Sequence, residues 1–205
     1  MTANSVTTNL PWMWLVSRGS GLVLLVLFTA VLVLGISTRL GSGSRSMPRF
    51  AVAELHRTLA LFAVAMLLLH VVTAVLDPYV AIGWWATILP FTAHYRTVAL
   101  GLGTLAVDIG AAVLLTSLAR RRVGHRVWRA VHWLAYLSWP LAFLHSLKAG
   151  GDMKIWWVAA LVWGSAIVVA VAIGTRLVVA TGGDKTTWIN ADGRSAAIRR
   201  SGDRR

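Results

Sequence analysis

The stretch His125–Leu147, with the sequence HRVWRAVHWLAYLSWPLAFLHSL, decides how the rest of the chain is interpreted. It is apolar enough to cross a membrane, yet His132 and His145 lie inside its apolar part. An imidazole in hydrocarbon is costly unless it has a partner, so histidines at such positions indicate a functional site. The stretch therefore predicts a membrane helix whose histidines face partners across a helix bundle.

An earlier stretch, Glu54–Leu76, repeats this arrangement with His56 and His70. These histidines are 14 residues apart, which on a helix is about 40° short of four turns, so both lie on one face. The helical rise separates them by roughly 21 Å, most of a hydrocarbon core about 30 Å thick. Two histidine-bearing segments therefore predict four ligands that face one another.

The composition is typical of a protein that crosses the bilayer several times. Of the 205 residues, 57% are hydrophobic, and the mean hydropathy is +0.69, more than a soluble domain of this size requires. The net charge of +13 comes from bases in short segments between apolar runs. That distribution is typical of cytoplasmic membrane loops, so we expect no nucleic-acid partner. The absence of cysteine excludes disulfides, iron–sulfur clusters and thiolate metal sites.

Five apolar segments predict an all-α, polytopic membrane helix bundle with five transmembrane helices, since each is near the ~20 residues that span hydrocarbon. The predicted spans are Trp12–Ser37, Phe50–Leu76, Thr97–Ala119, Val127–Leu147 and Ile155–Leu177. They form one predicted membrane domain, residues 12–180, which follows an external segment, residues 1–11. The Gly-rich, charged residues 181–205 predict a basic, disordered cytoplasmic tail.

Basic residues concentrate in the first loop, the third loop and the C-terminal tail. They are Arg39, Arg45, Arg49, Arg120, Arg121, Arg122, Arg126, Arg176, Lys185, Arg194, Arg199, Arg200, Arg204 and Arg205. Since cytoplasmic loops are enriched in Lys and Arg, we expect the N-terminus outside and the C-terminus in the cytoplasm of a multi-pass plasma or inner membrane protein. The short apolar segment Tyr79–Phe91 contains Pro90 and predicts an interfacial or re-entrant piece, a lid on the outer face.

This orientation makes the two histidine-bearing spans parallel, because both begin in the cytoplasm. His132 and His145 are 13 residues apart, a rise of roughly 20 Å. Matching depths then pair His132 with His56 on the inner side and His145 with His70 on the outer side. The 13-residue spacing is about 140° short of four turns on an ideal helix. Either Pro140 kinks or rewinds the helix, or the outer site is swung sideways, and the sequence leaves both open.

Paired imidazoles at two depths, with no carboxylate or thiolate beside them, suit two haem b groups, each held by two axial histidines. Zinc requires three or four ligands converging at one point. Two stacked haems predict an electron path across the membrane. The alternative is that all four are core histidines hydrogen-bonded to neighbouring helices, which the repeated spacing disfavours. We expect His94 and His125, outside these spans, to be solvated or to face haem propionates.

Three stretches also resemble a known family, the ferric-reductase-like transmembrane proteins. VGHRVWRAVHWLAYLSWPLAFLHSL is similar to the haem-binding helix of that family, and ELHRTLALFAVAMLLLHVVTAVLD to its other ligand helix. SRGSGLVLLVLFTAVLVLGI resembles the helix that precedes the first ligand helix. The family includes NADPH oxidases, yeast-type ferric reductases and the haem membrane subunit of a bacterial periplasmic methionine sulfoxide reductase system. The similarity covers about residues 12–177.

The resemblance implies a b-type cytochrome that moves electrons from a cytoplasmic flavin to an acceptor on the far side. Many relatives have a C-terminal domain that binds FAD and NAD(P)H, and this sequence does not show one. We therefore expect an oxidoreductase component that needs a separate flavoprotein reductase or a quinol as electron donor. The external acceptor stays open among ferric iron, oxygen, quinone and a partner enzyme.

Three arginines are candidate cofactor contacts. Relatives have an arginine near the outer haem, so the resemblance implies that Arg18 contacts a propionate or substrate, with interfacial snorkelling as the alternative. Arg57 and Arg129 flank the inner histidines, where propionates need cationic partners. For these two, the alternative is the ordinary excess of basic residues at cytoplasmic helix ends.

Two aromatic residues fall between the histidines of their spans. Phe62 and Trp139 are candidates to fill the gap between the two haems and shorten the electron path, and ordinary packing is the alternative. On the third span, glycines allow close helix contact. They are Gly101, Gly103 and Gly110.

The sequence thus predicts a dihaem electron-transfer subunit, with two alternatives. One is a haem-free integral-membrane anchor or scaffold for a redox partner, in which the histidines are only structural. The other is a proton-coupled transporter that uses Asp108 and the histidines, although no inverted repeat or broken-helix pair is visible. An ionised carboxylate is expensive near the middle of a span, so we favour Asp108 bonded to a neighbouring helix.

Overall fold

The computed structural model describes residues 12–40, 48–78, 80 and 82–202, with side chains described as far as residue 181. Within these ranges the chain is helical and has no strand, which confirms the predicted all-α class. The helices are α1 (Trp12–Arg39), α2 (Arg49–Leu76), α3 (Thr97–Leu118), α4 (Arg120–Trp133), α5 (Ala135–Ala149) and α6 (Trp156–Gly202), with short 3-10 turns η1 (Trp84–Thr87) and η2 (Asp152–Lys154).

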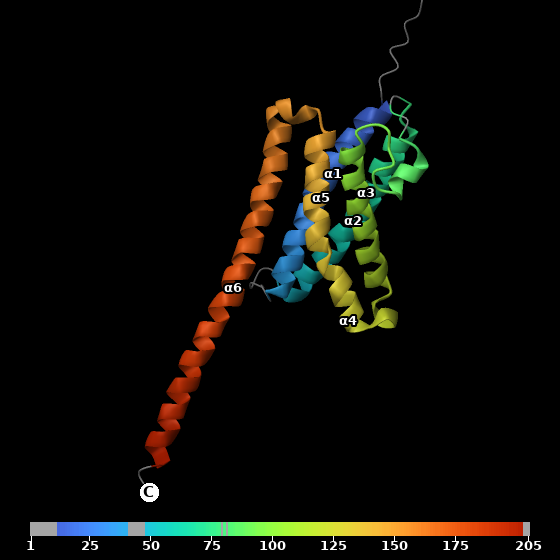
Figure 1. Ribbon diagram of the computed structural model, residues 1–205. Helices are drawn as coiled ribbons and strands as arrows, with labels where there is room; N and C mark the ends of the chain where they lie inside the picture. The colour runs from blue at the N-terminus through green and yellow to red at the C-terminus, as the bar shows by residue number, and fades with distance from the viewer. Residues whose placement is uncertain (1–11, 41–47, 79, 81, 203–205) are drawn as a thin grey trace, which may run out of the picture.

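Four of the described helices are long and apolar enough to cross a membrane, so the chain is a multi-pass membrane protein. The candidate spans are Trp12–Arg39, Arg49–Leu76, Thr97–Leu118 and Trp156–Thr181. The expected fifth span, Val127–Leu147, is divided between α4 and α5, which meet at Leu134. The correction is therefore that two shorter helices, set at an angle in Figure 1, replace one long helix.

Prolines set the two ends of α2. Pro48 precedes its first residue, where the missing N–H of proline costs no helical hydrogen bond. At the other end Leu76 is followed by Asp77 and Pro78, and a residue before proline is driven out of the helical region. Asp77 accordingly has extended dihedral angles, φ −65° and ψ 116°.

The buried core lies on one side of α1, against α5 and α6. One cluster joins Leu32, Ile36, Trp139 and Val169, and a second joins Leu25, Val158 and Val162. Figure 1 shows α6 running beside the bundle and continuing beyond it. The backbone there stays helical to Gly202. Once a helix is nucleated, each further residue adds a hydrogen bond, so it can continue past its last packed turn.

On the other side of α1, α2 packs along its length, whereas α3 packs along α4 and α5. Within the described part of the chain, α2 buries only Val52 to the degree of a core residue. The face of α2 that points toward α4 and α5 borders a cavity between these helices. This cavity is where the histidines lie.

The short segment between α2 and α3 covers one end of the cavity. η1 is tied down because Thr104 Oγ1, on α3, donates to the Ala86 carbonyl at 2.6 Å. Phe91, with φ 65°, lies against the bare backbone of Gly101. Ile82 and Tyr95 line the cavity, so the segment sits where a lid was expected. We call this end of the bundle the lid end.

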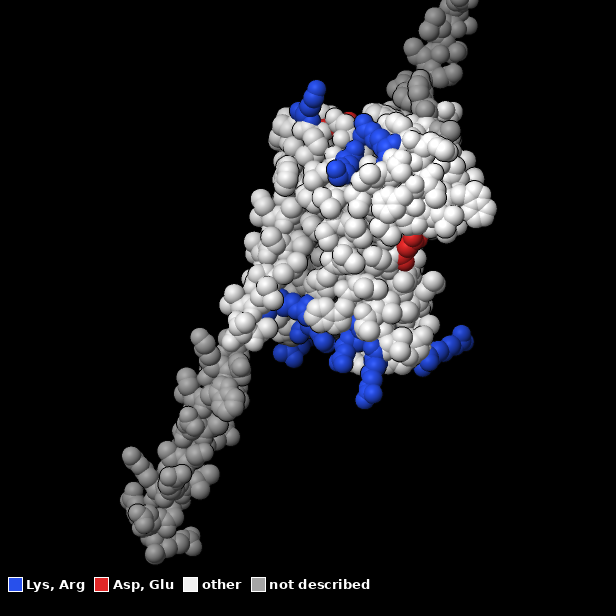
Figure 2. Space-filling model, viewed as in Figure 1, with Lys and Arg blue, Asp and Glu red and all other residues white. Residues whose placement is uncertain are grey.

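The opposite end, which we call the basic end, gathers arginines around the start of α2 and the loop between α3 and α4. Figure 2 shows most of the visible Lys and Arg side chains there, with a smaller group at the lid end. The described arginines of the basic end are Arg39, Arg49, Arg57, Arg120, Arg121, Arg122, Arg126, Arg129 and Arg176. The expected external segment, residues 1–11, lies outside the described residues.

Candidate functional site

The four histidines of the two predicted pairs meet across the cavity, one pair near each end. The ring centroids of His56 and His132 are 6.4 Å apart, and those of His70 and His145 are 6.2 Å apart. Both pairs join α2 to the α4–α5 segment, which makes α2 parallel to that segment. Among the described residues no three His, Asp or Glu side chains form a metal site, so the histidines meet in twos.

Hydrogen bonds from the neighbouring helices orient three of the four imidazoles. His56 Nδ1 lies 2.9 Å from the Val31 carbonyl oxygen on α1. On the same helix, His70 Nδ1 lies 2.8 Å from the Ser17 carbonyl oxygen. A carbonyl oxygen can only accept, so Nδ1 of each ring must bear the hydrogen.

His145 is held in the same way by α3, with its Nδ1 2.8 Å from the Ala99 carbonyl oxygen. The hydrogen on Nδ1 leaves Nε2 of each of these three rings with a free lone pair. Neutral imidazoles that donate Nδ1–H to a carbonyl and keep Nε2 free are the usual form of a histidine that binds a metal.

His132 differs from the other three. Its Nδ1 is buried and has no hydrogen-bond partner among the described residues. The ring stacks instead on Trp128, with centroids 5.1 Å apart, and the Arg120 guanidinium lies 4.1 Å from the centroid of Trp128. The basic-end pair is therefore oriented by one carbonyl and one stacked aromatic ring.

The turn at Leu134 accounts for the 13-residue spacing between His132 and His145. The Leu134 N–H bonds the Val131 carbonyl at 2.9 Å, and the Leu137 N–H bonds the Leu134 carbonyl at 2.9 Å. Such three-residue bonds tighten the winding, so the two histidines are not on one ideal helix.

The bend therefore lies six residues before Pro140, which was one of the two explanations that the sequence left open. Pro140 itself lies inside the continuous helix α5. A proline removes only the hydrogen bond to the carbonyl four residues earlier, here that of Tyr136. Of the two alternatives that the sequence left open, this geometry does not support a kink centred on Pro140.

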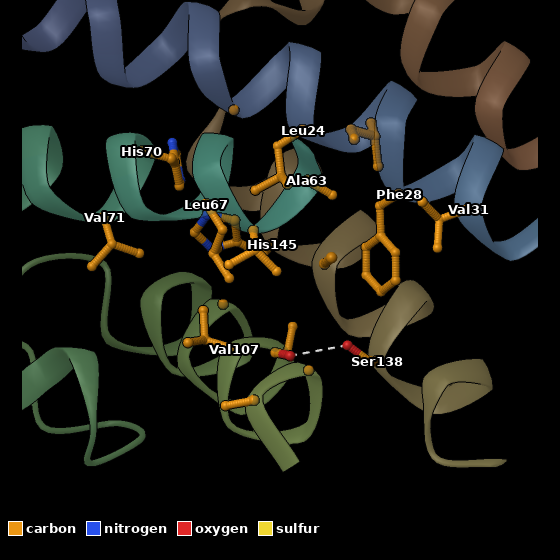
Figure 3. Close-up of a pocket in the computed structure, with 18 of the residues that line it drawn as sticks. Leu24, Phe28, Val31, Ala63, Leu67, His70, Val71, Val107, Ser138 and His145 are labelled. Carbon is orange, nitrogen blue, oxygen red and sulfur yellow. Dashed lines mark hydrogen bonds between the residues drawn. The ribbon is translucent and has the colours of Figure 1, made fainter. Parts of the chain in front are cut away.

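The cavity between the pairs has a volume of about 1100 Å³ and is lined mostly by apolar side chains. This volume is slightly above the roughly 300–1,000 Å³ typical of small-ligand sites. Figure 3 shows Leu67, Val71 and Val107 around the lid-end pair, and Phe28 directed from α1 toward the space before Ser138. The dashed line in that view is the bond from buried Ser138 Oγ to the Ala106 carbonyl, 2.9 Å long.

Neither aromatic expected between the pairs lines the cavity. The side chain of Phe62 is 58% exposed on the outside of α2, because its place on the helix is turned away from the histidine face. Trp139 is buried on the opposite side of α5, where its Nε1–H donates to Thr29 Oγ1 at 3.0 Å and its ring stacks on Phe143. Phe28 lies in the cavity instead, a residue that the sequence reasoning missed.

Arginines line both ends of the cavity, and the three expected ones are among them. Arg18 Nη1 donates to the Ala149 carbonyl at 3.0 Å, and its Nε lies 3.5 Å from Asp152 Oδ2. Arg96, whose role the sequence did not reveal, donates to the same carbonyl at 2.8 Å. The arginines that line the basic end are Arg39, Arg57, Arg120, Arg129 and Arg176.

The remaining candidates lie outside the cavity. His94 and His125 are exposed. Asp108 is half-buried on α3, and the described residues include no hydrogen-bond or ion-pair partner for it. The bond to a neighbouring helix that we expected for this carboxyl group is therefore not present within the described part of the chain.

Comparison with known families gives one match. The model of a family described as "Ferric reductase like transmembrane component" matches residues 20–143, more than half of the chain. The matched range includes His56, His70 and His132 and stops two residues before His145. No curated protein and no solved structure matches the chain.

Proposed function

Because the chain belongs to the ferric-reductase-like transmembrane family, we propose that it is a b-type cytochrome subunit that conducts electrons across the membrane. In this proposal His56 and His132 hold one haem b at the basic end, and His70 and His145 hold a second at the lid end. A haem held by two histidines in this way would supply electron transfer rather than direct ligation of a substrate.

The observation that supports this function best is the separation within each pair. Imidazole nitrogens bind metals such as zinc at about 2 Å, and a ring nitrogen lies about 1 Å from the ring centre. Two rings on opposite sides of one metal ion therefore have centroids roughly 6 Å apart. The observed 6.4 and 6.2 Å fit that arrangement, and so do the free Nε2 atoms.

The surroundings of the pairs also suit a large planar group with carboxylate arms. The apolar lining provides contact for a macrocycle, and arginines at both ends provide charge-assisted partners for propionates. Arg18 lies at the lid end, whereas Arg57 and Arg129 lie at the basic end. Phe28, between the two pairs in the cavity, takes the bridging position that we had expected for Phe62 or Trp139.

Under this proposal, electrons enter the protein at the basic end. We propose that the basic end faces the cytoplasm, where a separate flavoprotein reductase or a quinol supplies electrons. The lid end then faces the external acceptor, with the segment around η1 between the acceptor and the second haem. Such a protein is an oxidoreductase component that lies in the plasma or inner membrane.

The decisive experiment counts haem. Protein purified from haem-replete cells should show a reduced b-type spectrum and about two haems per chain in a pyridine haemochrome assay. His70→Ala and His145→Ala should each remove the lid-end haem and leave the other in place. His94→Ala, at an exposed histidine, is the matched control and should retain both.

A haem-free anchor or scaffold for a redox partner is the competing function. It is favoured by one observation, since three of the four histidines already have hydrogen-bond partners within the bundle. Wild-type protein that binds no haem but still assembles with a redox partner would establish the scaffold and exclude the cytochrome.

A further inference from the structure

We propose that three glycines are positioning residues that hold the haem-binding histidines in one tautomer. Each glycine lies four residues after a helix carbonyl, and that carbonyl accepts the Nδ1–H of a histidine from the facing helix. The three pairs of carbonyl and glycine are Ser17 and Gly21, Val31 and Gly35, and Ala99 and Gly103. The inference rests on the proposed function, because it concerns the same four ligands.

Helix geometry explains why the fourth residue matters. The carbonyl of residue i points toward the N–H of residue i+4, and the Cβ of residue i+4 leans back toward that carbonyl. The oxygen has two lone pairs, so it can accept the helical bond and one more. A side chain at i+4 would occupy the approach to the second lone pair, and glycine leaves it open.

At the lid end there is little space for a side chain at the glycine positions. A Cβ added at Gly103 would lie 2.6 Å from His145 Nδ1, the atom that donates to Ala99. A Cβ added at Gly21 would lie 3.0 Å from His70 Cε1 and 3.1 Å from its Nδ1. Both histidine rings would have to move away from their carbonyls.

At the basic end the fit is looser. A Cβ added at Gly35 would lie 3.3 Å from His56 Cε1 and 3.6 Å from its Nδ1. A displacement of a few tenths of an ångström relieves this contact and lengthens the bond to Val31. The three glycines thus form a graded series, with Gly103 the tightest and Gly35 the loosest.

The bonds that these glycines permit also tune the site. A backbone acceptor at Nδ1 fixes the ring orientation and raises the basicity of Nε2, and loss of such a partner typically costs about 10- to 100-fold in metal affinity. A more basic ligand favours the ferric state. Weakening the bond should therefore raise the midpoint potential of the haem concerned and loosen its retention.

The chain provides control glycines on helices of the same bundle. A Cβ at Gly19 on α1 or at Gly164 on α6 would meet nothing within 4 Å, and neither glycine lines the cavity. Alanine is a better helix former than glycine, so all five Gly→Ala changes favour the helix itself. The new methyl group meets a histidine ring in the three test variants and meets nothing within 4 Å in the controls.

The experiment compares Gly103→Ala, Gly21→Ala and Gly35→Ala with Gly19→Ala and Gly164→Ala in the purified, haem-loaded protein. Haem content, low-spin EPR signals and midpoint potentials are the measurements. Gly103→Ala and Gly21→Ala should weaken retention of the lid-end haem by about 10- to 100-fold. Gly35→Ala should keep both haems and raise the potential of the basic-end haem alone.

The other possible outcomes distinguish failure of the glycine role from failure of the proposed function. Two haems in the wild type, with unchanged potentials and EPR signals in all three test variants, would overturn the glycine role and leave the cytochrome intact. Equal losses in the Gly19 and Gly164 variants would overturn it as well. If Gly103→Ala fails to accumulate in the membrane, Gly35→Ala decides, since its small displacement is compatible with folding. Wild-type protein without haem would refute the proposed function itself.

Discussion

Each oriented histidine of the candidate site is held by a helix other than its own. His56 and His70 lie on α2 and bond to α1, and His145 lies on α5 and bonds to α3. Each bond fixes a helix position and a ring orientation together. The position of each ring therefore depends on how a second helix packs, and a change in that packing should be visible in the spectrum of the bound group.

Trp139, unlike the histidines, is a buried side chain that we expect to serve helix packing alone. Trp139→Phe removes its bond to Thr29 and keeps most of its ring contact. Interhelical bonds of this kind contribute about 0.6 kcal/mol on average and up to about 1.7 kcal/mol in a membrane protein. We expect a loss in that range in SDS unfolding and an unchanged haem spectrum. Trp163→Phe, at a half-exposed ring, should show neither effect, and a shifted haem spectrum in Trp139→Phe would return that residue to the electron path.

Phe28 tests the electron path between the two pairs. Phe28→Ala should leave the haem content unchanged and slow electron transfer from the basic-end to the lid-end haem. We expect a fall on the order of tenfold, equal to about 1.4 kcal/mol on the barrier. Flash-induced reduction followed by the absorbance of each haem measures it. Phe62→Ala, on the outside of α2, is the control, and equal rates in both variants would remove Phe28 from the path.

At the scale of elements, the turn between α4 and α5 sets the angle of the lid-end ligand. Inserting one alanine after Leu134 should rotate α5 by about 100° and move His145 away from His70. The variant should lose the lid-end haem and keep the basic-end haem, as counted by pyridine haemochrome. The same insertion after Gly150, in the loop beyond α5, should keep both.

Pro140→Ala gives the complementary result, because the bend lies upstream of the proline. The variant restores an N–H for the Tyr136 carbonyl and removes a helix penalty of up to about 3 kcal/mol. We expect both haems and both potentials to persist, with equal or higher resistance to SDS unfolding. Loss of the lid-end haem would instead place the functional bend at Pro140.

At the scale of the whole molecule, the charged side chains distinguish the two ends of the bundle. The basic end gathers nine described arginines and receives the C-terminal ends of α1 and α3, whereas the lid end has fewer cations and pairs one of them with Asp152. We expect the C-terminus in the cytoplasm. A reporter that functions in the cytoplasm should therefore be active when it is fused to the C-terminus. Activity of a reporter that requires an external location would reverse the proposed direction of electron flow.

The sequence predicted the helical class and the two histidine pairs, because hydrophobic length and helical rise depend only on local spacing. It could not predict the break at Leu134, since nothing in that residue differs from an ordinary helical leucine. The sequence also does not show how each helix is rotated about its axis, and for this reason Phe62 and Trp139 were candidates for the cavity, which neither of them lines. Phe28 lies seven residues from both Gly21 and Gly35 on α1. This spacing would have indicated its position between the two pairs if the contacts of those glycines with His70 and His56 had been known.

The small number of buried residues on α2 has a consequence for the lifetime of a newly synthesised chain in the cell. Within the described residues this helix buries only Val52 and packs chiefly on α1, so a bound group in the cavity adds contacts that the polypeptide lacks. A ligand at a thousandfold excess over its dissociation constant stabilises a fold by about 4.1 kcal/mol. If the cavity binds haem as proposed, the supply of haem should therefore govern how fast membrane proteases degrade the protein. Cells that lack haem should degrade it faster than haem-replete cells.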